Sequence, residues 1–271
     1  MNNTKILRNI VKRDLLYGFS KNKGKYIIFA LLIVLITVGM CNSIKSNEGN
    51  IVDLIFLNYR GIGYLDNIKE LNALPIIWIT INVFVAFIVG DFVSEDLKRN
   101  SIYVITRTKR FKEYWVSKVY WVVINVFFIY LILFTTTYFI GRLFIEDSIV
   151  WSKLSNDLIK SILVKEVVAR NFIITLIILY FTTSVAISFL QIYLTMFTKS
   201  NISYLIIVIV TCFSIFIDNQ LLPGIHSMIL KHDYFDNIHN LTLLKSILYN
   251  ISLTLMFSYL GYRKITKKDI I

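Results

Sequence analysis

The chain has 271 residues, of which 56% are hydrophobic and 17% charged, and only two are prolines. A water-soluble domain of this size could not bury so much apolar surface, so the composition excludes a soluble enzyme or binding domain. The formal net charge is +12, and the basic residues flank apolar runs instead of forming one patch, which favours a membrane surface over nucleic acid as a partner. We therefore predict an all-α membrane protein.

The first 25 residues combine an apolar and a basic helical face. Lys5, Arg8 and Lys12 gather on one face, while apolar residues recur near helical spacing on another. This pattern predicts a helix that lies along the inner membrane surface and turns into the bilayer at Gly24. The alternative is a disordered basic leader that only sets topology. The apolar residues are Ile6, Leu7, Ile10, Val11, Leu15 and Phe19.

Six apolar runs are long enough to cross roughly 30 Å of hydrocarbon as helices. They are residues 26–44, 75–93, 116–144, 171–197, 202–217 and 244–262, and the fifth is the shortest. The alternating pattern of a transmembrane barrel is missing, so the predicted fold is a six-helix bundle. Cys41 and Cys212 both fall inside these runs, which argues against a disulfide or metal framework.

The distribution of lysine and arginine predicts the orientation, because these residues resist translocation next to a span. Residues 1–25, 94–118, 198–201 and 263–271 hold nineteen of the 29, and all four segments lie on one side. We expect this side to be cytoplasmic, with both termini on it. The heavy use of Ile, Lys and Asn is typical of a low-GC bacterial gene, so we expect the membrane to be a bacterial plasma membrane. A single domain is expected over 1–271, comprising an N-terminal helix (1–25), a six-span bundle (26–262) and a tail (263–271).

Residues 95–111, between the second and third spans, intersperse apolar with basic side chains. This composition predicts a short amphipathic helix at the cytoplasmic surface that can present charges to another protein. A loop that only sets topology is the alternative.

The order of residues in this segment carries a resemblance to a known family. The second span is followed by Glu95-Asp96-Leu97, a polar pair, hydrophobic residues, Thr106-Arg107 and a basic cluster that ends at Arg110, before Lys118 opens the long third span. This order resembles the permease subunits of type-2 ATP-binding-cassette (ABC) exporters. The chain departs from the family pattern in two places. Asn100-Ser101 replaces a Gly-Thr pair, and no proline stands between Thr106 and Arg110.

The resemblance implies six spans, an inner-surface helix before the first, and a coupling segment that docks on a separate ABC ATPase subunit. It also implies a second permease copy or paralogue, and short membrane-dipping helices in the outer loop 218–243. The residues that would contact the ATPase are Glu95, Asp96, Lys98, Arg99, Asn100, Ser101, Arg107 and Arg110.

The chain has no phosphate-binding loop of its own. Its one Gly-Lys pair, Gly24-Lys25, leads into Tyr26 and a span. We therefore expect no enzymatic activity and no cofactor in this chain, with ATP and Mg²⁺ bound by the partner, and an amphiphilic cargo such as a peptide, lipid or drug. The rival interpretation is an ATP-independent membrane protein, for example an immunity or sensor subunit.

Three further sets of polar residues have structural interpretations. Residues Glu166 to Arg170 resemble the end of the Glu-Glu-x-x-x-Arg motif of a membrane protease family. Lys165 stands where that motif has its first glutamate, which argues against a membrane peptidase. Asp91 is expected to be neutralised by Lys98 or Arg99. Polar residues within spans are expected to form interhelical hydrogen bonds, and none is assigned to a substrate path. They are Asn82, Asn125, Thr182, Thr183, Ser184, Ser188, Gln191 and Asn250.

The final outer loop contains three histidines, His226, His232 and His239, together with Asp233 and Asp236. These side chains are acceptable zinc ligands, but spacings of six and seven residues match no metal motif. A solvated interfacial loop is therefore favoured over a metal site.

Overall fold

The computed structural model describes residues 3–64, 74–97, 101–108 and 110–267. The fold is 78% helical, and these residues contain no strand. The elements are α1 (Asn3–Ser46), α2 (Ile51–Tyr59), α3 (Ile76–Glu95), α4 (Ser101–Thr108), α5 (Phe111–Phe144), α6 (Lys153–Leu158), α7 (Ala169–Thr195), α8 (Ser200–Phe216), the 3-10 helices η3 (Pro223–Ser227) and η4 (Ile229–Lys231), and α9 (Leu243–Thr266).

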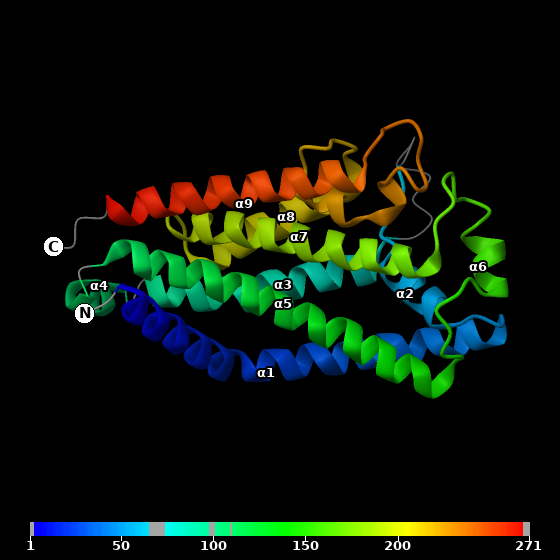
Figure 1. The fold of residues 1–271 in the computed structure, drawn as a ribbon, viewed down its shortest axis with the longest axis horizontal. Coiled ribbons are helices and arrows are strands. Elements are labelled where there is room, and N and C mark those ends of the chain that lie inside the picture. Colours follow the sequence, from blue (N-terminus) through cyan, green and yellow to red (C-terminus); the bar gives the residue numbers. More distant parts are fainter. Residues whose placement is uncertain (1–2, 65–73, 98–100, 109, 268–271) are drawn as a thin grey trace.

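Within the described residues, five helices are long and apolar enough to cross a membrane: α1, α3, α5, α7 and α9. This confirms the all-helical class, and apolar helices of this length indicate a membrane protein. The fifth predicted run forms α8, an apolar helix of 17 residues. Because α7 and α9 run in the same direction along the bundle, the chain must return between them, and α8 makes that return (Figure 1). Helix α1 begins and α9 ends at the same end of the bundle, which also carries α4 (Figure 1). We call it the basic end.

The predicted turn at Gly24 is wrong. Helix α1 continues through Gly24 as one helix of 44 residues, about 66 Å at the usual rise per residue. One glycine costs a helix only about 1 kcal/mol, and the N-terminal half of α1 buries Ile6, Ile10 and Asp14. The bundle therefore supports this half of the helix, although it is inclined to the remainder of α1 (Figure 1).

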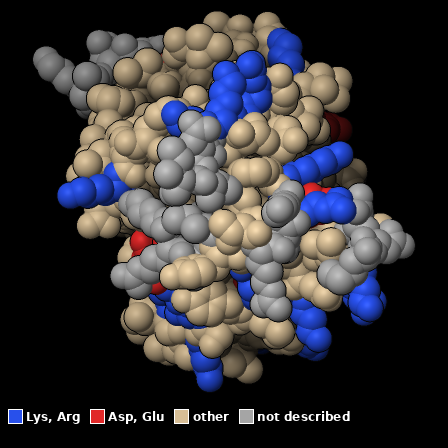
Figure 2. Space-filling model, turned by 90° about the vertical axis from the view of Figure 1, so that its left-hand side faces the viewer, with Lys and Arg blue, Asp and Glu red and all other residues tan. Residues whose placement is uncertain are grey.

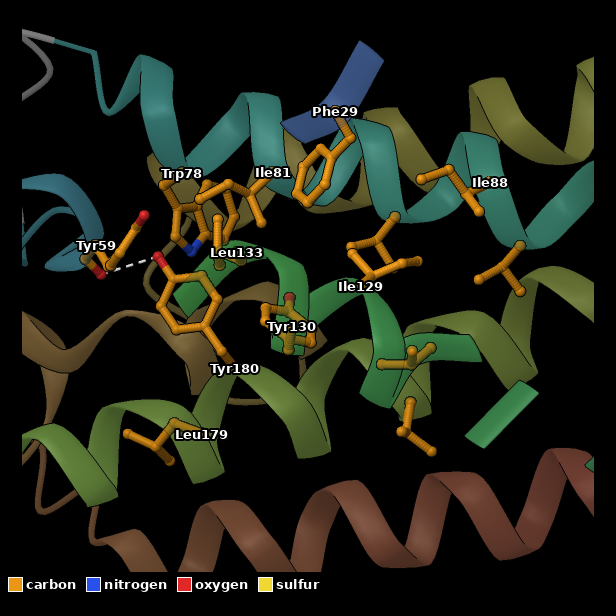
Figure 3. Close-up of a cluster of buried hydrophobic side chains, with 14 of the residues drawn as sticks. Phe29, Tyr59, Trp78, Ile81, Ile88, Ile129, Tyr130, Leu133, Leu179 and Tyr180 are labelled. Atoms are coloured by element: carbon orange, nitrogen blue, oxygen red, sulfur yellow. Dashed lines mark hydrogen bonds between the residues drawn. The ribbon is translucent and has the colours of Figure 1, made fainter. Parts of the chain in front are cut away.

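Several large core side chains meet near the end opposite the basic end. Tyr59 of α2, Trp78 of α3, Tyr130 of α5 and Tyr180 of α7 are all buried, and they converge from four helices (Figure 3). The Tyr180 hydroxyl donates to the Tyr59 carbonyl at 2.8 Å, and the Trp78 indole N–H donates to the Ser227 hydroxyl at 3.0 Å. The hydroxyls of Tyr59 and Tyr130 bond Thr137 and Ser184, so each of these four polar tips has a partner.

Interhelical hydrogen bonds join the bundle along its length, which confirms the structural interpretation of several polar residues in the spans. The Asn250 amide of α9 donates to the Thr183 hydroxyl of α7 at 3.0 Å. The Gln191 amide of α7 donates to the Ala86 carbonyl of α3 at 2.9 Å. Ser184 of α7 bonds the Tyr130 hydroxyl of α5 at 2.5 Å. Such bonds are worth about 0.6–2 kcal/mol each in a membrane.

Candidate functional site

The candidate site is the basic end, where one side of α1 contacts the last turns of α3. Arg13, Tyr17, Lys21 and Lys25 are spaced four residues apart, so they fall on one side of the helix. The Arg13 guanidinium lies 3.3 Å from Asp96, and the Tyr17 and Phe92 rings are 5.9 Å apart. Further along α1, Lys21 forms an ion pair with Glu95, and Lys25 Nζ lies 2.5 Å from Asp91. These four contacts fix the end of α3, immediately before α4.

A cluster of buried charges lies beside these contacts. Lys118 of α5 is 1% exposed and lies between two carboxylates that are equally buried, Asp14 of α1 and Asp96 at the end of α3. Lys118 Nζ is 2.8 Å from Asp14 Oδ2 and also forms an ion pair with Asp96. The Ser117 hydroxyl donates to Asp14 at 2.7 Å, and the Tyr114 hydroxyl donates to Asp96 at 2.7 Å. We call Asp14, Asp96 and Lys118, with Arg13, the buried ion cluster.

The charges of the buried ion cluster balance, with two carboxylates facing one ammonium and one guanidinium. Burial alone would raise the pKa of the Asp96 carboxyl, but Lys118, Arg13 and the hydrogen bond from Tyr114 lower that pKa below its ordinary value. Asp96 is therefore ionised at neutral pH. Removal of one member would leave a buried charge without its partner, which typically costs about 3–5 kcal/mol.

Helix α4 follows this cluster after a short connection. Its Ile105 is buried, whereas Tyr103 is 75% exposed. A short amphipathic helix therefore lies between α3 and α5 at the basic end and presents an aromatic side chain to its surroundings (Figure 1).

The residues expected to contact a partner have different fates. Glu95 pairs with Lys21, and Arg110 lies 3.1 Å from Glu113. Asp96 is not at the surface, because the buried ion cluster encloses it. Lys98, Arg99 and Asn100 lie outside the described residues, and Ser101 and Arg107 belong to α4 without a described side chain.

Asp91 has a partner that was not expected, and the expected ones, Lys98 and Arg99, lie outside the described residues. Its carboxylate pairs with Lys25 of α1 and accepts a hydrogen bond from Ser200 of α8 at 3.2 Å, which ties three helices together. Sequence reasoning also missed Asp14 and the bridging role of Lys118. The available signals were the four-residue spacing of Arg13, Tyr17, Lys21 and Lys25, and a lone lysine at the start of an apolar run.

Viewed along the bundle, the basic end carries many lysine and arginine side chains and few acidic ones (Figure 2). Among the described residues, the acids near this end each pair with a lysine or arginine, and they are Asp14, Asp91, Glu95, Asp96 and Glu113. The surface charge of this end is therefore strongly positive.

Comparison with known families gives one match. A model for a family of proteins of unknown function, DUF2705, matches residues 30–271. The chain belongs to the DUF2705 family. No curated protein and no solved structure matches it. The matched region begins within α1 and includes α4 and Lys118, but not Arg13 and Asp14.

The loop between α8 and α9 of this DUF2705 protein is folded rather than solvated, so the expectation of a solvated histidine loop is wrong. The loop forms η3 and η4, and His226, Lys231 and His232 are buried. Lys231 Nζ lies 2.5 Å from Asp218 Oδ1 and donates to the Ser214 carbonyl at 3.2 Å. Short helices were expected in this loop. The apolar residues beside them in the chain explain why η3 and η4 pack against the rest of the bundle.

The two buried histidines are held as neutral rings. The Nε2–H of His226 donates to the Gln220 carbonyl at 2.9 Å, and Ser246 bonds Nδ1 at 2.9 Å. Burial lowers the pKa of His226 and of His232 to about 4. His239 instead bonds Asp236 and stacks on Tyr64. Among the described residues, no three His, Cys, Asp or Glu side chains are grouped so that they could hold a metal ion.

Proposed function

We propose that this DUF2705 protein is the transmembrane subunit of an ABC transporter, which exports an amphiphilic substrate with ATP hydrolysed by a separate subunit. In this proposal α1, α3, α5, α7, α8 and α9 are the six spans, and α4 is the coupling helix. A second copy of the chain, or a paralogue, completes the translocation path.

The observation that carries the proposal is the placement of α4. It lies at the basic end between the second and third long helices, with Ile105 buried and Tyr103 exposed. An exposed aromatic residue is a frequent anchor in protein contacts. The resemblance of residues 95–111 to exporter permeases points to the same role.

The count of six spans includes α8, whose 17 residues extend about 26 Å and so fall slightly short of the usual hydrocarbon thickness. The return of the chain between α7 and α9 supports α8 as a span (Figure 1), and local thinning of the bilayer is a known response to a short span. The excess of lysine and arginine at the basic end supports a cytoplasmic location for that end. The proposed site of action is a bacterial plasma membrane.

The buried ion cluster suggests how a movement of α4 would reach the spans. Asp96 ends α3 and stands just before α4, while Lys118 and Asp14 belong to α5 and α1. A partner that displaced α4 would therefore pull on α1, α3 and α5 together. Such a pull could shift the bundle between inward- and outward-facing states.

The test is purification of the tagged chain from its native membrane in mild detergent, with an ATPase assay on the proteins that co-elute. We expect a stoichiometric ATPase with the wild-type chain. It should be lost with Tyr103→Asp, and also with the charge reversal Lys98→Glu, Arg99→Glu and Arg107→Glu.

Ile238→Asp is the matched control, because Ile238 is an 81% exposed apolar residue in the outer loop. It should leave the complex intact. Absence of an ATPase from every preparation would contradict the proposal and favour an ATP-independent membrane protein. An ATPase retained by both α4 variants would show that the partner binds elsewhere.

A further inference from the structure

The basic residues of the N-terminal half of α1 divide into two sets. Arg13, Lys21 and Lys25 face α3, and each has an acidic partner. The other set is exposed and forms no ion pair with any residue in the described ranges. Successive members are spaced so that all lie on one face of the helix. This set, which we call the α1 stripe, consists of Lys5, Arg8, Lys12 and Lys23.

The α1 stripe continues directly into the apolar outer side of the same helix. Ile27, Leu31 and Leu35 are 51%, 59% and 73% exposed and follow Lys23 at intervals of four residues. In a membrane protein such a side faces lipid acyl chains. Leu16, 64% exposed, lies within the stripe between Lys12 and Lys23. One side of α1 therefore changes from apolar to cationic along its length. The apolar part matches the acyl chains of a lipid, and the cationic part matches the headgroup.

The inclination of α1 keeps the stripe close to the membrane surface. Tyr26 bonds Asn125 of α5, and Asp14 pairs with Lys118 of α5. At a rise of 1.5 Å per residue, the two contacts are about 18 Å apart along the axis of α1 but only about 10 Å apart along the axis of α5. The N-terminal half of α1 therefore crosses α5 obliquely and rises slowly from the bilayer. With Lys23 at the headgroup layer, Lys12 would lie roughly one Debye length from that layer.

We propose that the α1 stripe binds the headgroups of anionic phospholipids at the basic end. The positive charge of the stripe is left unneutralised by the fold, and anionic headgroups complement it. Its continuity with the acyl-facing side favours lipid over a soluble acidic protein as the occupant, because lipid already covers the adjoining turns. Each lysine or arginine near an anionic surface contributes a few-fold to the attraction. The inference does not depend on the presence of an ATPase partner.

The test uses the purified chain in nanodiscs of phosphatidylcholine, with and without phosphatidylglycerol. A fluorophore is attached at Leu16→Cys in a Cys41→Ala, Cys212→Ala background, and its quenching by a headgroup-linked quencher is measured. We expect phosphatidylglycerol discs to give at least about twofold more quenching at low salt, and the difference to shrink as salt screens the charges. Neutralisation of the stripe by Lys5→Gln, Arg8→Gln, Lys12→Gln and Lys23→Gln should abolish the difference.

The matched control removes the same number of charges from exposed positions elsewhere near the same end: Lys112→Gln, Lys199→Gln, Arg263→Gln and Lys267→Gln. This variant should retain the lipid dependence. Equal quenching in both lipids, or equal loss in both variants, would overturn the proposal. So would a fluorophore that stays in water in both lipids and is shielded only when a protein partner is bound.

Discussion

Lys118 Nζ lies 2.8 Å from Asp14 Oδ2, although 104 positions separate the two residues in the chain and both side chains are only 1% exposed. Lys118 also pairs with Asp96, so a single ammonium group joins α1, α5 and the end of α3. The charges are fully paired only when all three elements are in place.

Lys118→Met should destabilise the protein by about 3–5 kcal/mol, because it leaves two buried carboxylates without their shared cation. The measurement is the unfolding temperature in detergent. Lys112→Met, at an exposed position of the same helix, should change stability by about 0.5 kcal/mol or less. A Lys118→Met protein as stable as the control would show that the cluster does not hold α1 in place.

Substitution of two glycines of α1 by alanine should have opposite effects on stability. A methyl group on Gly18 would meet the buried Trp121 ring at 2.1 Å, whereas one on Gly24 would meet nothing within 4 Å. Gly18→Ala should therefore destabilise by about 1–3 kcal/mol through overpacking. Gly24→Ala should stabilise by up to about 1 kcal/mol, because alanine favours a helix. Thermal unfolding of both variants checks this, and a destabilising Gly24→Ala would indicate a turn at that position.

The loop between α8 and α9 should lose stability in mild acid. The pKa values of His226 and His232, at about 4, lie below the ordinary histidine value near 6.5, so the unfolded loop takes up protons first as the pH falls. The stabilisation is fully present above about pH 6.5 and decreases towards pH 4, and at pH 5 the loss is on the order of 1–2 kcal/mol per histidine. Hydrogen exchange of residues 218–242 at pH 7.5 and pH 5 measures it.

The control for this pH effect is His239, which is partly exposed and bonded to Asp236. His239→Gln should keep the pH dependence, whereas His226→Gln combined with His232→Gln should weaken it. Exchange that is equal at both pH values in the wild-type chain would show that the buried rings do not govern the loop.

Loss of one interhelical hydrogen bond should be measurable without loss of the fold. Asn250→Leu removes the amide that donates to Thr183 between α9 and α7, and about 0.6–2 kcal/mol of stability should be lost. Ser252→Ala is the control, since Ser252 lies on the exposed side of α9 and its hydroxyl bonds only its own helix. Similar unfolding temperatures for the two variants would contradict the interpretation.

The helical membrane class was predictable because apolar runs of about 20 residues have few other uses. The end of α5 at Phe144 agrees with the predicted span, and α4 lies where an amphipathic segment was expected. Gly24 misled the prediction. A glycine between lysines suggests a turn, but the buried contacts of Ile6, Ile10 and Asp14 outweigh that local preference.

The buried ion cluster could not be predicted because its members are far apart in the sequence. Asp14 and Lys118 each read as one charge in a basic segment, and only tertiary packing brings them together. Local reasoning assigned Asp91 to the nearest cations in the chain. Its partner Lys25 lies 66 residues away in the sequence, on α1. Spacing rules for a single helix concern residues three or four positions apart, so they do not predict this pair.

The pairing of Asp14 with Lys118 also constrains the order in which the chain can assemble during synthesis. Ribosomes add about 5–20 residues per second, so the 104 residues between the two partners imply a delay of about 5–20 s. Throughout that interval the N-terminal half of α1 has emerged without the lysine that neutralises its carboxylate. This half can therefore form its contact with Lys118 only after α5 has been inserted, so a helix made early in synthesis reaches its final position late.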